Sequence, residues 1–305
     1  MAAEYIKVLK ELNADVTVIG RGEEKINAIK EKFDVNAVSG GIDAFLESNP
    51  QLPETAIVAV SIKELIPVTL MLLNLGVKDI LIEKPAGLSQ HDIDTLVNES
   101  NRLNANLWVA YNRRFYKSVD LLKERIKEDG GISSVNFEFT EWVHDIETYN
   151  YPPEILNKFV LANSSHILDT VFHLAGRPET IHIQLAGNDI PWHPSGSIFM
   201  GTGITENNIP FSYNANWDAP GRWAIEILTR KHRYYLKPLE RLAVQKKASV
   251  QVNEVESDYS IDINFKPGLL NMVKAFFEKD ATNLCTIEEH QKNFLFYEKI
   301  AGYTT

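Results

Sequence analysis

The stretch Ile80-Leu-Ile-Glu-Lys-Pro-Ala-Gly87 decides the predicted fold class. Its first three residues form a short apolar run, typical of a strand buried on both faces of a parallel sheet. Glu83, Lys84 and Pro85 follow at once, and the proline restricts Lys84 to extended geometry. Ligands of open α/β sheets bind at the carboxyl ends of the strands, so Lys84 is a candidate site residue. A surface Glu-Lys pair that ends a strand is the alternative.

The sequence around this stretch alternates short apolar runs with helical patterns. This alternation is typical of a parallel sheet covered by helices, and Ser89 is placed to cap the last helix. We therefore predict an α/β, Rossmann-type domain over residues 1–115, incomplete at its start. Its strands are expected at residues 15–20, 35–38, 55–60, 79–82 and 106–111, with helices at 4–12, 22–33 and 91–103.

The pattern changes after Phe115 to one helix followed by long alternating strands. Such alternation predicts an α+β domain with a large, mostly antiparallel, open-faced sheet over residues 116–305. The open face of this sheet predicts a homodimer or homotetramer. Strands are expected at residues 132–142, 180–186, 197–203, 211–217, 223–229, 232–238 and 249–255, with helices at 117–127, 163–175, 269–279 and 286–303.

Composition narrows the class of partner. The 305 residues carry 31 Lys and Arg against 41 Asp and Glu, a net charge of −10. Such a chain does not favour nucleic acid or an anionic membrane, since both reward clustered positive charge. The single cysteine, Cys285, fits a reducing compartment, and no apolar run approaches the ~20 residues of a membrane span. We expect a cytoplasmic protein with a small-molecule ligand.

A second motif lies within residues 162–173. On a helix, His166, Asp169 and His173 fall at positions i, i+3 and i+7, on one face. An imidazole beside a carboxylate suits proton transfer near pH 7. The alternative is a solvated face or a set of structural hydrogen bonds. No metal site is expected, because the other histidines show no paired spacing.

Together these features resemble the glucose-fructose oxidoreductase, inositol dehydrogenase and MocA (Gfo/Idh/MocA) family over nearly the whole chain. Three motifs carry the resemblance: Glu83-Lys84-Pro85, Tyr111-Asn-Arg-Arg-Phe115 and His166-x-x-Asp169. The resemblance implies an oxidoreductase that transfers hydride between a nicotinamide cofactor and a carbinol carbon of a sugar, sugar derivative or cyclitol.

The resemblance also implies roles for particular residues. His166 is the expected general acid/base, and Lys84 orients and supports the reacting oxygen. Arg113 and Arg114 are candidates to hold a carboxylate, a phosphate or sugar hydroxyls, with a salt bridge at the domain junction as the alternative for each. Two further substrate-binding candidates are Asn163 and Trp142, although packing is the commoner role of a tryptophan in a sheet.

Two departures from the family pattern concern the candidate site. Many members carry Asp four residues before the histidine, where this chain has Ala162, so either Asp169 substitutes or the proton relay differs. Leu65 stands where the cofactor-facing helix often has a histidine, which leaves Ser61 as the candidate there. The full set of cofactor-binding candidates is Arg21, Ser61, Glu83, Lys84 and Pro85.

The cofactor-binding loop is the largest departure. No Gly-x-Gly-x-x-Gly/Ala turn precedes the first helix, and the chain is expected to lack roughly 10 to 15 residues, one strand and a glycine turn. One hypothesis is a start at an internal methionine, and the other is a genuine loss. Gly20-Arg21 ends the next strand with a cation, which favours NADP slightly over NAD; stacking on adenine or exposure to water is the alternative for Arg21. The alternative function is a non-catalytic sugar or nucleotide sensor on the same fold.

Overall fold

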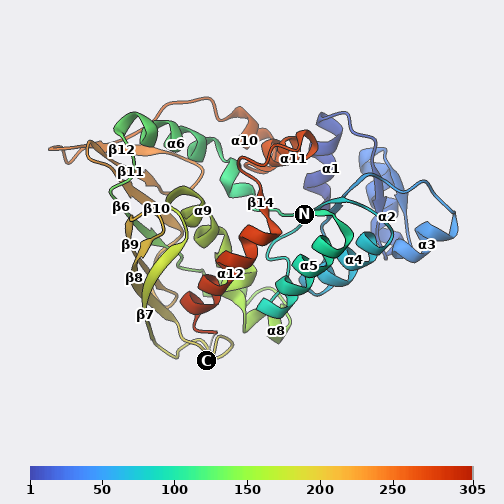
Figure 1. Ribbon diagram of the computed structural model, residues 1–305, viewed down its shortest axis with the longest axis horizontal. Helices are drawn as coiled ribbons and strands as arrows, with labels where there is room; N and C mark the ends of the chain where they lie inside the picture. The colour runs from blue at the N-terminus through green and yellow to red at the C-terminus, as the bar shows by residue number, and fades with distance from the viewer. Residues whose placement is uncertain (304–305) are drawn as a thin grey trace.

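The computed structural model describes residues 1–303 and has two lobes (Figure 1). The first contains short parallel strands with helices, and the second is built on one large sheet. The predicted fold class, a Rossmann-type domain followed by a mostly antiparallel sheet, is confirmed.

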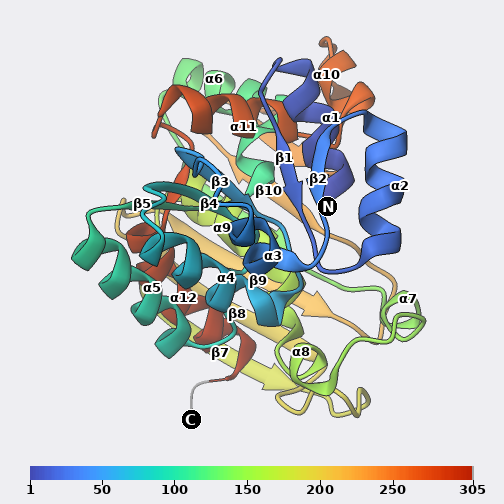
Figure 2. The ribbon, with the colours of Figure 1, turned by 90° about the vertical axis from the view of Figure 1, so that its right-hand side faces the viewer.

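The parallel strands of the first lobe fall into two sheets. β1 pairs with β2, and β3, β4 and β5 form a second sheet in that spatial sequence. In Figure 2, β1 and β2 lie to the right of β3, β4 and β5. Within residues 1–303, β1 and β3 therefore each have one edge without a strand partner. The strands are β1 (Thr17–Ile19), β2 (Asn36–Val38), β3 (Thr55–Val58), β4 (Asp79–Ile82) and β5 (Asn106–Val109).

Five helices accompany these strands. Ser89 caps α5 as predicted, because its hydroxyl accepts from the amide of Asp92 while the Asp92 carboxylate accepts from the amide of Ser89. One of the five, α3, was not predicted from the sequence, and α4 was expected only as the cofactor-facing helix that contains Leu65. The helices are α1 (Ala2–Glu11), α2 (Glu23–Phe33), α3 (Gly41–Glu47), α4 (Ile62–Asn74) and α5 (Gln90–Leu103).

The second lobe is an eight-stranded sheet in the spatial order β13-β12-β11-β10-β6-β9-β8-β7. All neighbours are antiparallel except β6 and β9, which are parallel. The short strand β12 was not predicted. The strands are β6 (Ser134–Glu138), β7 (Pro178–Ala186), β8 (Ile198–Thr205), β9 (Pro210–Asn216), β10 (Ala224–Leu228), β11 (His232–Leu236), β12 (Ala243–Lys246) and β13 (Val252–Glu254).

Helices cover one face of this sheet. α9 and α12 lie between the sheet and the first lobe (Figure 1), and a π-helical turn, η2, leads directly into α9. Phe199, Phe211 and Ile225 point toward these helices and are buried, whereas Thr202 and Asn214 on the opposite face are exposed. The helices are η1 (Asn112–Phe115), α6 (Lys117–Asp129), α7 (Val143–Ile146), α8 (Pro153–Leu156), η2 (Val160–Ser164), α9 (Ser165–Ala175), α10 (Ser260–Asn264), α11 (Leu269–Glu278) and α12 (Ile287–Ala301).

The carboxyl-terminal part of the chain returns to the first lobe. The strand β14 (Cys285–Thr286) pairs antiparallel with β5, and α11 and α12 pack against α1 and α5. η1 ends at Phe115, the last residue of the first predicted domain, whereas residues 269–301 of the second predicted domain pack against elements of both lobes. This return joins the lobes through backbone hydrogen bonds as well as side-chain packing.

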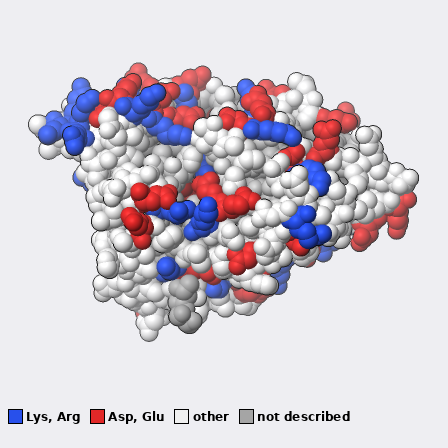
Figure 3. Space-filling model, viewed as in Figure 1, with Lys and Arg blue, Asp and Glu red and all other residues white. Residues whose placement is uncertain are grey.

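The surface carries both signs of charge. On the face seen in Figure 3, acidic and basic side chains are interspersed, with a basic group at the tip of the large sheet near β12. None of the helices within residues 1–303 has the length and apolar composition that crossing a membrane requires.

Candidate active site

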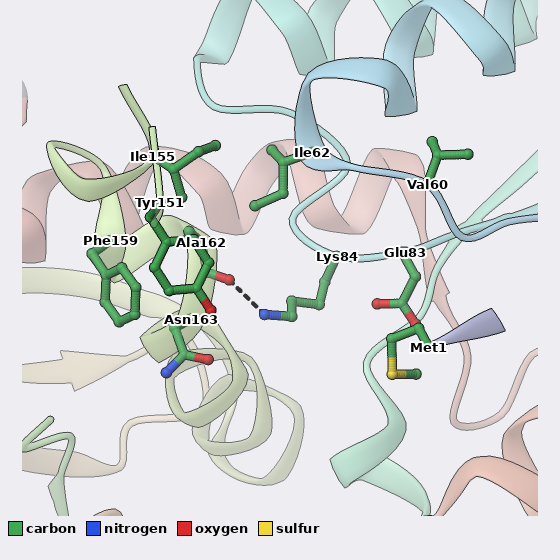
Figure 4. Close-up of a pocket in the computed structure, with 10 residues that line it drawn as sticks. All are labelled: Met1, Val60, Ile62, Glu83, Lys84, Tyr151, Ile155, Phe159, Ala162 and Asn163. Carbon is green, nitrogen blue, oxygen red and sulfur yellow. Dashed lines mark hydrogen bonds between the residues drawn. The ribbon is translucent and has the colours of Figure 1, made fainter. Parts of the chain in front are cut away.

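Lys84 lies where the buried strand β4 ends, between the two lobes. It lines a cavity of about 200 Å³ together with residues of both lobes (Figure 4). Its Nζ donates a hydrogen bond of 2.5 Å to the carbonyl oxygen of Ala162 in η2. Burial lowers the pKa of Lys84 to about 8, the nearby Glu83 opposes the shift, and Arg113 and Lys266 add to it. The Lys84–Pro85 peptide bond is cis, and the carbonyl of Pro85 accepts a hydrogen bond of 2.9 Å from His290 Nε2.

His166 lies in the first turn of α9, four residues after the carbonyl that Lys84 contacts. Its ring is flanked by Tyr111, with ring centroids 5.8 Å apart, and by Trp223, at 6.2 Å. The Nδ1 atom is buried and has no hydrogen-bond partner in the described part of the chain. Burial lowers the pKa of His166 well below its usual value, and Arg113 and Lys84 lower it further. The imidazole is therefore neutral at pH 7, and the same shift makes it a weaker base than an ordinary histidine.

Asp169 is not brought to His166. It is fully buried and forms a two-point ion pair with Arg114, with nitrogen–oxygen distances of 2.7 and 2.8 Å. Arg114 also contacts Glu289 at 2.7 Å, on the carboxyl-terminal helix α12. The expectation that Asp169 replaces the missing carboxylate beside the histidine therefore finds no support in the geometry. Arg114 takes the alternative role, a salt bridge at the domain junction.

Arg113 differs from its neighbour in having no such pair. Its guanidinium lies over the ring of Trp223, 4.5 Å from the centroid, and 5.9 Å from that of Tyr116. Its Nε is buried without a hydrogen-bond partner, and no carboxylate within residues 1–303 forms a salt bridge with it. Of the two predicted arginines, Arg113 alone has no salt bridge within residues 1–303, and it is not among the residues that line the cavity.

Two residues that the sequence did not indicate complete this side of the site. Glu141 is buried and accepts hydrogen bonds from Ser164 at 2.6 Å and Asn163 at 3.0 Å. Arg222 pairs with it at 3.2 Å. Burial raises the pKa of Glu141, and these contacts oppose the shift. Because the partners lie 22 to 81 residues apart in sequence, no local pattern indicates them.

The predicted Trp142 lies at the edge of this cluster. Its ring carries the guanidinium of Arg222, 4.5 Å from the centroid, and its Nε1 donates to the carbonyl of Gly221 at 2.9 Å. The side chain is 45% exposed. Asn163 lines the cavity, whereas Trp142 does not.

The remaining candidates lie on the first-lobe side. Glu83 lines the cavity and accepts a hydrogen bond of 2.7 Å from Tyr5 Oη of α1. Ser61 is the N-cap of α4, without a capping hydrogen bond from its side chain. Arg21, after β1, pairs with Glu64 in the first turn of the same helix. Arg21 and Ser61 are thus brought to one helix N-terminus.

No group of three or more His, Cys, Asp and Glu side chains within residues 1–303 is arranged to hold a metal ion. The predicted neighbour His173 lies apart from His166, with Nε2 3.4 Å from Lys123 Nζ. The residues that share the lobe junction are therefore Lys84, His166, Arg113 and the pair Glu141–Arg222.

Comparison with known proteins shows which solved structures share this fold. No protein-family model matches the chain, and no curated protein matches it in sequence. Solved structures do match. A dehydrogenase (MviM) from Clostridium difficile is 18% identical with a TM-score of 0.77, and the alignment covers 99% of this chain and 95% of that one. The chain has the fold of this dehydrogenase.

Two further structures with this dehydrogenase fold contain ligands. An oxidoreductase from Agrobacterium radiobacter, in complex with NAD+, L-tartaric acid and magnesium, is 13% identical with a TM-score of 0.78, covering 100% of this chain and 94% of that one. The WlbA dehydrogenase from Chromobacterium violaceum, in complex with NADH and UDP-GlcNAcA, is 15% identical with a TM-score of 0.69, covering 99% and 90%.

Proposed function

We propose that this protein is an oxidoreductase that transfers hydride between a nicotinamide cofactor and a carbinol carbon of a sugar-like substrate. The observation that carries the proposal is the hydrogen bond from Lys84 Nζ to Ala162 O. It brings the cation at the end of β4 to the turn that leads into His166, close enough for Lys84 to lower the pKa of the imidazole. The fold shared with the dehydrogenases supports it.

Each of the two residues has a role in this chemistry. When bound, the nicotinamide supplies or accepts the hydride. Neutral His166 accepts the proton of the substrate hydroxyl in oxidation and returns it in reduction. Lys84 carries a positive charge below pH 8 and stabilises the negative charge that develops on the same oxygen. In this proposal Asp169 acts on Arg114 and only indirectly on His166.

The cavity suits the nicotinamide end of the cofactor. Met1, Val60 and Ile62 give it apolar walls on the first-lobe side, next to Glu83 and Lys84 at the carboxyl end of β4 (Figure 4). For the pyrophosphate end we propose a position at the amino terminus of α1, next to Met1 of the cavity wall. The first turn of α1 has no capping side chain, so its amides are the available donors.

NAD is the cofactor we propose, and the slight preference for NADP finds no support. Arg21 pairs with Glu64, so its charge is already neutralised by a carboxylate of α4. The two solved structures that contain a cofactor hold NAD+ and NADH. A phosphate on the adenosine ribose would compete with Glu64 for Arg21, whereas NAD makes no such demand.

A binding and turnover experiment tests the proposal. NADH and NADPH are titrated into the protein by nicotinamide fluorescence, and NAD+ reduction is then followed with a panel of sugars, sugar acids and cyclitols. We expect NADH to bind more tightly than NADPH and at least one member of the panel to reduce NAD+. The proposal is wrong if neither dinucleotide binds, or if cofactor binds and no member of the panel supports hydride transfer.

A sensor is the second candidate function. It is favoured by the buried His166 Nδ1, which has no hydrogen-bond partner within residues 1–303. A sensor binds the sugar without changing it. Binding of a panel member by calorimetry, together with no nicotinamide oxidation or reduction by that same member, would favour this function.

A further inference from the structure

Arg113 is a cation at the lobe junction that forms no salt bridge with any carboxylate of the described chain. Its Nε is buried without a partner, although the residue as a whole is only partly buried. By contrast, Arg114 next to it binds two carboxylates and Arg222 binds Glu141. A partly buried guanidinium without an ion partner is costly unless a ligand supplies the negative charge.

Two lysines add to this positive charge. Lys84 and Lys266 both approach Arg113 closely enough that each has its pKa lowered by it, in addition to the larger effect of burial. All three cations lower the pKa of His166. The positive charge is therefore concentrated around the imidazole that we propose as the acid/base.

The nearby carboxylates form no salt bridge with these three cations within residues 1–303. Glu83 accepts a hydrogen bond from Tyr5, although it still favours the charged form of Lys84 and of Lys266. Glu141 is shared between Arg222 and the side chains of Asn163 and Ser164. Glu240 also favours the charged form of Arg113, and Glu4 that of Lys266, so what the three cations lack in the described part of the chain is a salt bridge and not a nearby carboxylate.

We infer that the substrate of this site is an anion, with a carboxylate or phosphate group held by Arg113 next to the reacting carbinol. This inference rests on the proposed function and narrows its substrate class. A guanidinium presents two parallel N–H donors that match the oxygens of either group. The ring of Trp223 lies against the guanidinium and limits its movement, so that the donors keep a fixed direction.

Arg222 does not take this role, although it lies over the same ring, 5.0 Å from the centroid. Its guanidinium is paired with Glu141, which is buried and has no other cation partner among the salt bridges of residues 1–303. Removing Arg222 would leave that carboxylate unpaired. The two arginines therefore differ: Arg222 forms a salt bridge with Glu141, whereas Arg113 forms none within residues 1–303.

The test compares anionic ligands with their neutral counterparts. Hexuronic acids, aldonic acids and hexose 6-phosphates are titrated by calorimetry in the presence of NADH, each beside the neutral hexose or alditol of the same configuration. The variants are Arg113→Gln and, as a control, Arg125→Gln on the exposed surface of α6. Circular dichroism and thermal unfolding verify that each variant is folded.

We expect at least one anion to bind about tenfold more tightly than its neutral counterpart, and this preference to vanish in R113Q but not in R125Q. Preference for the acids identifies a carboxylate and preference for the sugar phosphates a phosphate. The inference is overturned if no anion is preferred, or if the preference survives in folded R113Q. Should R113Q not fold, Lys266→Gln replaces it, and an unchanged preference in K266Q overturns the inference.

The same experiment separates this inference from the proposed function. Neutral sugars that are oxidised without any preference for anions would leave the oxidoreductase function standing and remove the anion site. Anions that bind through Arg113 without any hydride transfer would support the anion site and remove the oxidoreductase function.

Discussion

Lys84 and Ala162, 78 residues apart, are joined by a hydrogen bond of 2.5 Å between the ammonium group of one and the carbonyl of the other. Ala162 is the position at which an aspartate would stand in many proteins that the sequence resembles. The backbone carbonyl of Ala162, rather than a carboxylate side chain, accepts the hydrogen bond from Lys84. The contact lies in a π-helical turn, a conformation that often marks functional sites.

The first prediction concerns the pH dependence of kcat/KM and follows from the pKa of Lys84. Burial lowers it from the usual 10.5 to about 8, so the charged form is lost at a lower pH than for an ordinary lysine. If charged Lys84 supports the reacting oxygen, kcat/KM should fall as the pH rises through about 8. In Lys84→Arg we expect a lower maximal kcat/KM. The decrease of kcat/KM above about pH 8 should disappear in this variant, because arginine stays protonated. A wild-type profile that is flat between pH 7 and 10 would contradict the assignment.

The second prediction concerns stability and follows from the buried ion pair between Arg114 and Asp169. Both side chains are almost completely buried, and Asp169→Asn removes the charge that compensates Arg114. We expect the free energy of unfolding to fall by about 3–5 kcal/mol in urea titrations. Glu289→Gln removes the outer, 39% exposed partner of the same arginine and should cost less than about 1 kcal/mol. Equal losses for both variants would be inconsistent with a buried junction pair.

The third prediction concerns the oligomeric state and follows from the open face of the large sheet. This face lies opposite the one that α9 and α12 cover, and it carries Met200, Thr202 and Asn214. We propose that a second copy of the chain packs there. Light scattering at micromolar concentration should give a dimer or tetramer, and Thr202→Arg, on this face of β8 next to the edge strand β7, should shift it to monomer. A wild-type protein that is only monomeric would remove this proposal.

Local pattern predicted much of the fold. The end of β4, the cap of α5 and the alternation in the second lobe are encoded in neighbouring residues, and the structure has each of them. The return of β14 to β5 was not predicted, because two residues carry no periodicity and their partner lies 176 residues earlier. The β12 strand was missed because its four residues are too few to show a clear alternation, although β11 and β13 flank it in the sheet.

The site was predicted less completely than the fold. Helical spacing places His166 and Asp169 on one face, but it does not show what faces them. The structure shows that Asp169 faces Arg114, while the ring of His166 faces Tyr111 and Trp223. Arg113 and Arg114 are adjacent in sequence and were equivalent candidates. Only the fold distinguishes them, because it brings carboxylates from α9 and α12 to Arg114 alone.

The most direct test of the account is kcat/KM for Lys84→Ala, measured beside Lys274→Ala, an exposed lysine of α11. Both variants should unfold at temperatures within a few degrees of the wild type. We predict that kcat/KM falls by about 10²-fold or more in K84A, the loss expected for one group that stabilises charge on the reacting oxygen, and is unchanged in K274A. Unchanged kcat/KM in folded K84A would contradict the catalytic role of Lys84.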